Sequence, residues 1–243
     1  MLPPIVSQET WLHARRDLLA KEKELTRARD RLNEERRKLP MVEVDKPYVF
    51  HGPSGEASLL DLFEGRRQLI IQHFMFDPTW DEGCPTCSCD ADGLGHLEHL
   101  HARDTSFAAV SRAPLASIET FKARMGWTFP WYSSYGSDFN YDFHVTLDAN
   151  VAPIQYNYRL LDDPDLAHGS AEMPGVSVFL QDDGRVFHTY SAYGRGTDLH
   201  NISYVYLDLT PLGRQEGWGG TIDLHGEGQN WVGHHDRYPT TPT

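Results

Sequence analysis

The sequence predicts an α/β fold, a three-layer sandwich in which one sheet lies between two layers of helix. From residue 67 onward, short apolar runs typical of buried strands alternate with segments of helical periodicity. The order strand, helix, strand, helix indicates parallel strands joined by right-handed crossovers. Two later apolar runs flank a turn that contains Asp183 and Gly184, which favours an antiparallel hairpin. We therefore expect one mixed sheet.

The N-terminal part of the chain predicts one long helix over residues 8–39. Neither Gly nor Pro occurs in this stretch, and Leu18, Leu25, Leu32 and Leu39 recur every seven residues. The companion positions are mostly charged, so the apolar stripe is too narrow for a self-sufficient coiled coil. We expect the helix to pack on the main domain or on a partner chain, and a homodimer through this helix is a candidate assembly.

The chain thus divides into a helical extension, residues 1–40, and a main domain, residues 41–243. The same periodicities assign the elements of that domain. Strands are expected at residues 48–50, 69–76, 107–111, 176–180 and 186–190, and helical segments at residues 59–63, 84–103, 113–126 and 197–209. From about residue 217 the chain is rich in Gly and polar residues, so we expect a C-terminal tail that wraps over the surface.

All three cysteines lie within six positions, between a predicted strand and the start of a predicted helix. A C-x-x-C motif in this place is typical of a thioredoxin-like redox site. Cys84 would lie at the helix start, where unpaired amide groups favour thiolate over thiol, and Pro85 fits the first helical turn. Cys87, one turn deeper, is suited to resolving a mixed disulfide.

Two strand–helix units, a hairpin and a closing helix complete the thioredoxin-like order. The predicted fold is therefore a thioredoxin-like three-layer sandwich with an added N-terminal helix and a C-terminal tail. Pro174 precedes the first hairpin strand, where a thioredoxin-like fold usually places a cis-proline that faces the disulfide; ordinary trans-prolines also precede strands. Cys89 lies about 200° around the helix from Cys87, so these two cannot easily pair. It is either a small core residue or a third thiol ligand.

The longest motifs of the chain resemble those of the DUF899 family. The similar runs are WDEGCPTCS at residues 80–88, ARD at 102–104, AVSRAPL at 109–115, GWTF at 126–129, SYGSDFNYDF at 134–143 and HHDRY at 234–238. Members of this family are described as predicted thioredoxin-like dithiol–disulfide oxidoreductases. The resemblance covers nearly the whole chain and implies this fold and this activity. Cys89 departs from the usual family pattern and leaves room for metal binding.

Aromatic residues are concentrated at residues 127–143, among hydroxyl and carboxylate side chains. They either complete the core of an ordered loop or form a wall that orients a small, enclosed substrate. The candidate substrate-binding residues are Trp80, Trp131, Tyr135, Asp138, Tyr141 and Pro174.

Thirteen histidines accompany the cysteines, and thiolates with imidazoles suit copper or zinc. The candidate metal ligands in this alternative are Cys84, Cys87, Cys89, His73 and His96. A structural role is the alternative for each histidine. His234 and Asp236 match part of a two-histidine, one-carboxylate iron site, in a tail without clear strand context.

The charge of the chain argues against two classes of ligand. The net charge is −13, although residues 8–38 carry ten basic and seven acidic side chains. The acidic main domain repels phosphate backbones, so we expect no nucleic-acid partner. No apolar run approaches the roughly 20 residues that span a bilayer, so we expect no membrane partner. Residues 1–6 lack the pattern of a signal peptide, and we expect a cytoplasmic protein, where clustered cysteines are more often catalytic or metal-binding than structural.

These observations favour a thiol–disulfide oxidoreductase in which Cys84 attacks and Cys87 resolves. The substrate would be a disulfide or a peroxidic small molecule, an external thiol would be the reductant, and no cofactor would be required. One alternative is a copper- or zinc-binding protein or oxidoreductase that uses the same thiols. Another is a non-enzymatic redox sensor that binds a small ligand.

Overall fold

The computed structural model describes residues 3–161, 169–217 and 228–238, and it divides into two compact units, Met1–Met41 and Val42–Thr243. The first unit contains helix α1 (Gln8–Arg36). Ser7 caps it by accepting a hydrogen bond from the Thr10 amide at 3.2 Å. The helix ends three residues before the predicted position, and none of its residues is buried. Packing of this helix on the main domain or on a partner chain stays a prediction.

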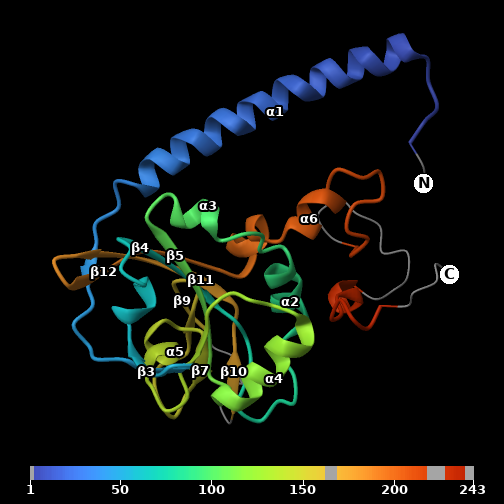
Figure 1. The fold of residues 1–243 in the computed structure, drawn as a ribbon. Coiled ribbons are helices and arrows are strands. Elements are labelled where there is room, and N and C mark those ends of the chain that lie inside the picture. Colours follow the sequence, from blue (N-terminus) through green and yellow to red (C-terminus); the bar gives the residue numbers. More distant parts are fainter. Residues whose placement is uncertain (1–2, 162–168, 218–227, 239–243) are drawn as a thin grey trace. The chain divides into compact units, whose positions relative to one another are not determined.

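The second unit is built on an eight-stranded mixed sheet (Figure 1). Strands β4, β5 and β6 are parallel, and every other neighbouring pair is antiparallel. In spatial order the strands are β1 (Val42–Glu43), β12 (Arg185–Tyr193), β11 (Gly175–Asp182), β4 (Gln68–His73), β5 (Thr105–Ser111), β6 (Trp131–Ser133), β2 (Val49–Gly52) and β3 (Gly55–Ser58). Parallel β4 and β5 followed by the β11–β12 hairpin form the predicted thioredoxin-like order, so the fold is thioredoxin-like.

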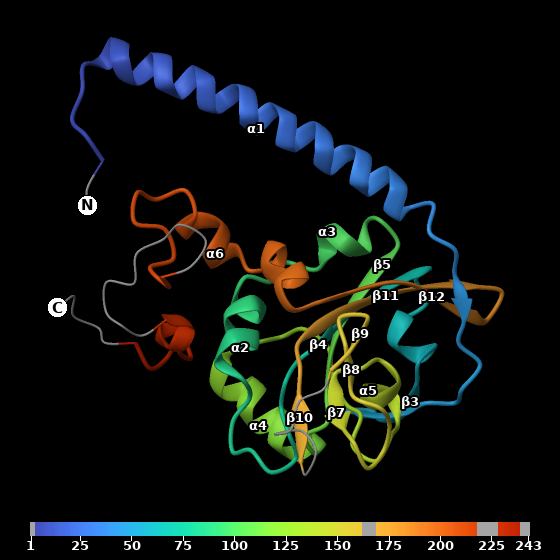
Figure 2. The same cartoon turned by 180° about the vertical axis from the view of Figure 1, so that it is seen from behind.

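Helices cover both faces of this sheet, as Figures 1 and 2 show. Helices α2 (Pro85–Asp92) and α4 (Leu115–Met125) pack on one face, whereas η1 (Asp61–Phe63) and α5 (Phe139–Asp142) pack on the other. The remaining elements are α3 (Glu98–His101), η3 (Gly194–His200), α6 (Ile202–Leu207), η4 (Gly228–Trp231) and two small hairpin-like sheets, β7 (Thr146–Asp148) with β10 (Ser170–Glu172) and β8 (Gln155–Tyr156) with β9 (Arg159–Leu160).

The alternation of side chains along β4 separates two hydrophobic cores. Leu69 and Ile71 face the core that contains η1 and α5. Ile70 and, just beyond the strand, Phe74 face the core that contains both cysteines of the C-x-x-C motif. A strand with apolar residues on both faces is the expected centre of a sheet covered by helices on both sides.

Two helices predicted as continuous are each interrupted. The segment 84–103 breaks after Asp92 and resumes at Glu98, because Gly93 and Gly95 stabilise a helix poorly. The segment 197–209 divides at Asn201, whose side chain accepts a hydrogen bond from the Tyr204 amide at 3.0 Å and starts α6.

The sequence also predicted two features of the β11–β12 hairpin: the turn between the two strands and the proline before β11. Asp183 (φ 50°) and Gly184 (φ 75°) both adopt the left-handed conformation that a two-residue hairpin turn requires, so the predicted hairpin is confirmed. Pro174 directly precedes β11, as predicted. The described part of the chain contains no cis peptide bond, so the peptide bond before Pro174 is trans and the expected cis-proline is not present. Among the same residues, no helix is long and apolar enough to cross a membrane.

Candidate functional site

The C-x-x-C motif lies where the chain returns from the end of β4 and enters α2. The Cys84 amide donates to the Met75 carbonyl at 2.9 Å, which fixes the start of the helix beside the end of the strand. Cys84 is the N-cap residue and Pro85 occupies the first turn, where its missing amide hydrogen leaves no bond unmade. The Ser88 amide and hydroxyl both donate to the Cys84 carbonyl, at 2.9 and 2.8 Å. The structure therefore places the motif where the sequence predicted it, after β4 and at the start of α2.

Cys84 is the more acidic thiol of the pair. A hydrogen bond from the Cys87 thiol, together with the backbone amides of Cys87 and Thr86, lowers the pKa of Cys84 to about 7 even though burial opposes ionisation. Cys84 is buried, with 8% of the residue exposed. These hydrogen bonds favour the thiolate form of Cys84, and both thiols are free rather than joined in a disulfide.

Cys87 has the opposite electrostatic character. The hydrogen bond that it donates to Cys84, its burial and the negative charge of Cys84 all raise its pKa well above the usual value. The Met75 amide donates to the Cys87 sulfur at 3.5 Å and partly offsets this rise. The hydrogen bond between the two thiols therefore favours the proton on Cys87 and the thiolate form on Cys84.

A cavity of about 320 Å³ lies against Cys87. Its walls come from the sheet strands β4 and β11, from helix α2, from the loop between α2 and α3, and from η3. Pro174 and Gly175 line it at the start of β11, opposite the cysteine. We call this space the Cys87 cavity. Its size is suited to a small molecule.

Two polar side chains of the Cys87 cavity stand out. Burial raises the pKa of Asp90 to about 7, and the negative charge of Cys84 adds to this rise, while Asn201 opposes it. Gln72 is buried and donates through Nε2 to the Cys87 carbonyl at 3.4 Å, but its Oε1 has no hydrogen-bond partner. A buried carboxyl and an unpaired acceptor thus lie in the same cavity as the thiol.

The C-terminal segment packs against the other side of the motif, next to Cys84. His234 is buried, and its Nε2 donates to the Gly83 carbonyl at 2.9 Å. Its Nδ1 lies 3.2 Å from the Glu82 carboxylate, and its ring lies against Phe121. One histidine therefore contacts both residues that precede Cys84.

Ion pairs surround this histidine. Glu82 pairs with Arg124 at 2.6 Å and with Arg237 at 2.7 Å, and Asp236 binds Arg124 through two hydrogen bonds of 2.8 and 2.9 Å. Arg124 holds the pKa of Glu82 below its usual value and lowers that of Asp236 to about 2. We call residues 233–238 the C-terminal clamp.

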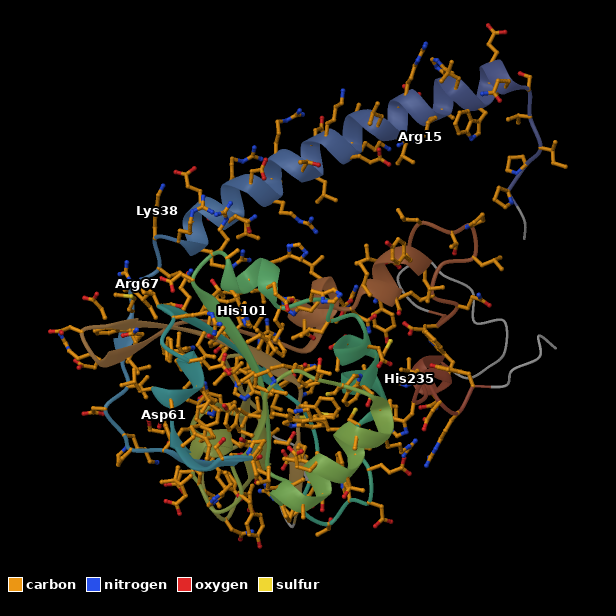
Figure 3. All side chains as sticks on the ribbon, in the orientation of Figure 1. Arg15, Lys38, Asp61, Arg67, His101 and His235 are labelled. Carbon is orange, nitrogen blue, oxygen red and sulfur yellow. The ribbon has the colours of Figure 1, made fainter. Side chains whose placement is uncertain are left out.

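The clamp also reaches the far end of α2. His235 Nδ1 lies 2.8 Å from the Asp92 carboxylate, which accepts a second hydrogen bond from Trp127 Nε1 at 2.8 Å. In both Figures 1 and 2 the C-terminal segment lies beside α2, and Figure 3 shows His235 on that segment. The helix of the motif is thus contacted by the clamp near both of its ends.

The chain matches one family along almost its whole length. The family is described as a bacterial protein of unknown function, DUF899, and the match covers residues 1–238. This chain belongs to the DUF899 family. No curated protein sequence matches it.

Two solved structures are among those similar to this DUF899 protein. A PrxQ mutant from Xylella fastidiosa is 14% identical and has a TM-score of 0.42, with 69% of this chain and 95% of that chain covered. The peroxidoxin BcpB from Mycobacterium tuberculosis is 12% identical at the same TM-score, with coverage of 68% and 95%. Because both scores are below 0.5, the fold assignment rests on the strand order described above.

The predicted metal ligands of the DUF899 protein do not form one group, although Cys84 and Cys87 are hydrogen-bonded to each other. The Cys89 thiol donates to the side-chain oxygen Oδ1 of Asn201 at 3.6 Å, and His96 is exposed beside Glu98. His73 faces the opposite side of the sheet, where it stacks on Phe143; its burial lowers its pKa to about 3. In the described part of the chain, no three His, Cys, Asp or Glu side chains are grouped so that they could hold a metal ion.

Of the predicted substrate-binding residues, only Pro174 lines the Cys87 cavity. Trp131 is fully buried in the core, and Trp80 is 40% exposed. Tyr141 accepts a hydrogen bond from Arg112 at 2.6 Å. The aromatic segment thus contributes to the core, which was the alternative to a substrate-binding wall. It does not line the cavity.

Tyr135 and Asp138, the two remaining candidates, lie in a different part of the molecule. Both border a separate surface hollow, where Asp138 pairs with Lys46 at 2.8 Å.

Sequence reasoning missed Gln72, Asp90 and the structural role of His234. Asp90 follows Cys87 by three residues on a helix and therefore shares its face, which is a signal that the sequence contains. Gln72 and His73 are adjacent on β4, so their side chains point to opposite faces of the sheet. Gln72 lies on the face that carries the cysteines. No local signal connects His234 with Gly83, which is 151 positions away.

Proposed function

We propose that this DUF899 protein is a dithiol–disulfide oxidoreductase that acts on a small molecule, with Cys84 as the nucleophile and Cys87 as the resolving thiol. The observation that carries the proposal is the opposed acidity of the two thiols, because Cys84 is held near a pKa of 7 by the proton that Cys87 retains. A pKa near the working pH combines a useful thiolate fraction with retained nucleophilicity.

The proposed reaction with a disulfide has two steps. The Cys84 thiolate attacks one sulfur of the substrate, so that a mixed disulfide forms and the other half of the substrate leaves as a thiolate. Cys87 then loses its proton and attacks the Cys84 sulfur, which releases the second half and forms the Cys84–Cys87 disulfide. Two electrons pass from the protein to the substrate, and an external dithiol returns them.

A peroxidic substrate leads to the same protein disulfide. The thiolate attacks the O–O bond, Cys84 becomes a sulfenic acid, and the remainder of the substrate leaves as an alcohol after protonation. The Cys87 thiol then condenses with the sulfenic acid, and water is lost. The same two cysteines suffice for both substrates.

Asp90 is the candidate acceptor of the Cys87 proton. It lies in the same cavity as Cys87 and bears the only carboxyl among the residues described as lining it. Its pKa of about 7 allows it to take up and release a proton near neutral pH. Its role is tested by the pH dependence of the resolving step in Asp90→Asn.

Substitution of the individual cysteines tests the proposed function. Cys84→Ser should abolish turnover of a disulfide substrate, whereas Cys87→Ser should accumulate a mixed disulfide at Cys84, seen by intact-protein mass spectrometry. Cys89→Ser is the matched control and should retain turnover, because its thiol contacts Asn201 and not the pair. Turnover that persists in Cys84→Ser would falsify the proposal.

A further inference from the structure

We infer that the Cys87 cavity binds the body of an uncharged, largely apolar small substrate that carries a hydrogen-bond donor. The inference names the substrate class of the dithiol site and so rests on the proposed function for the reaction that follows binding. The occupancy of the cavity itself can be measured separately.

The walls of the cavity are mainly hydrophobic. The apolar side chains that line it are Ile70, Leu94, Leu97, Leu100, Phe107 and Val176. They come from β4, β5, β11 and the region between α2 and α3, so they surround an occupant from several elements. An apolar body that fills this space removes its own surface and these walls from water, which is favourable.

Gln72 supplies the polar requirement. It is 6% exposed and lines the cavity, and its Nε2 already donates to the Cys87 carbonyl. Its Oε1 has no partner within the protein. A buried acceptor without a partner is unfavourable, so an occupant that donates a hydrogen bond there is preferred over one that only accepts.

The charges at the cavity disfavour an anionic occupant. Asp90 and the Cys84 thiolate repel an anion, and no Lys or Arg is present among the described residues that line the space. The histidines there are His73, which faces the other side of the sheet, His200, and His96, which lies beside the Glu98 carboxylate. Burial of an ion of either sign among the apolar walls is costly.

Cys87 connects the cavity to the nucleophile. It lines the space, and its thiol is hydrogen-bonded to Cys84. A disulfide held here by its apolar body brings its S–S bond to the thiol pair. That bond breaks, the Cys84–Cys87 bond forms, and both halves of the substrate leave as thiols after taking up two protons.

Two aromatic disulfides of equal size test the inference. Bis(ortho-aminophenyl) disulfide is uncharged and carries N–H donors, whereas bis(ortho-carboxyphenyl) disulfide is a dianion. The rate of formation of the Cys84–Cys87 disulfide is measured by stopped flow and divided by the rate of the same compound with dithiothreitol. We expect a preference of about tenfold or more for the amino compound. Equal normalised rates would overturn the inference.

A substitution that fills the cavity makes the test specific. Leu97→Trp should slow the reaction of the amino compound by about tenfold, and Leu94→Trp serves as a second variant. Leu60→Trp is the matched control, because Leu60 is an exposed leucine next to η1, on the other side of the sheet, and it should leave the rate unchanged. Unchanged alkylation of Cys84 by iodoacetamide shows that the filled variants keep the reactive thiol. If filling has no effect on the rate, the inference is wrong.

Gln72→Leu tests the hydrogen bond. It should slow the amino compound several-fold but leave diphenyl disulfide, which has no donor, unaffected. Equal slowing of the two compounds would overturn the requirement for a donor.

The failure of the inference differs from the failure of the proposed function. If neither aromatic disulfide produces the Cys84–Cys87 disulfide, the proposed function fails. If both produce it at equal normalised rates, the function stands and the assignment of the cavity fails.

Discussion

Cys84 and Cys87 are one helical turn apart, but the regions that surround them differ. The side of Cys84 is filled by the aromatic core and by the C-terminal clamp, and His234 is hydrogen-bonded to the residue before the cysteine. The side of Cys87 contains a cavity and an unpaired glutamine oxygen. The filled side can hold the nucleophile in place, and the open side has room for a molecule. A dithiol site needs both properties, and here they are divided between two sides of one helix.

The largest contrast in stability is expected when a glycine is replaced by alanine on each of the two sides. Gly83 lies on the filled side, where an added methyl group would come within 2.7 Å of the Phe74 ring and 2.8 Å of the Phe121 ring. Gly95 lines the cavity, and its added methyl group would meet nothing within 4 Å. Gly83→Ala should lower the free energy of unfolding by about 1–3 kcal/mol. Gly95→Ala should change it by less than about 0.5 kcal/mol.

Urea denaturation of the two variants measures this difference. Equal losses of stability would show that the two sides are packed alike, and the comparison would then be wrong.

The second prediction concerns the asymmetry of the thiols. In Cys87→Ala the hydrogen bond to Cys84 is lost, so the thiolate is less stable and the pKa of Cys84 should rise from about 7 by on the order of one unit. The rate of alkylation of Cys84 as a function of pH gives this value. Cys89→Ala is the control and should leave the pKa of Cys84 in place. An unchanged profile in Cys87→Ala would mean that the helix terminus alone sets the acidity.

Two histidines provide the third comparison. His234→Ala removes a buried hydrogen bond to the Gly83 carbonyl and should lower the free energy of unfolding by about 1 kcal/mol. It should also make Cys84 more accessible to alkylation at a pH well above its pKa of about 7, where this thiol is ionised in both proteins. His96→Ala removes an exposed side chain at the cavity and should have little effect on stability. Similar stabilities for the two variants would contradict a positioning role for the clamp.

The fourth prediction is a pH dependence that arises from Asp90. Its pKa is raised to about 7 by burial, so the folded state binds its proton more tightly than the unfolded chain does. The resulting stabilisation is complete below the unfolded pKa of about 4 and is lost as the pH rises through about 7. From about pH 5 to about pH 8, the natural protein should therefore lose stability relative to Asp90→Asn.

Unfolding by urea at the two pH values checks this sign. Asp30→Asn, on the exposed surface of α1, is the control, and its free energy of unfolding should change with pH as that of the natural protein does. A difference between the natural protein and Asp90→Asn that does not change with pH would mean that Asp90 titrates normally in the folded state.

Local features of the sequence were sufficient for much of the fold and for the thiol pair. Helix α1, strands β2, β4, β5, β11 and β12 and the Asp183–Gly184 turn were predicted, because periodicity and turn chemistry act between residues that are close in sequence. The short strands β1, β3 and β6 of the same sheet were not predicted. The positions of Cys84 and Cys87 at the start of α2 follow from the same kind of signal. Gly93 and Gly95 also indicated the break after α2, but the apolar pattern on either side of them favoured one continuous helix.

Only the tertiary structure decided which surfaces meet around the thiols. The contact of His234 with Gly83 joins residues 151 positions apart, and the Cys87 cavity has walls from four or more separate segments. His73, near the cysteines in sequence, faces away from them because side chains alternate between the two faces of a strand. Such contacts depend on how whole elements pack and fill space. Residue spacing along the chain therefore placed the reactive sulfurs, and three-dimensional packing decided what surrounds them.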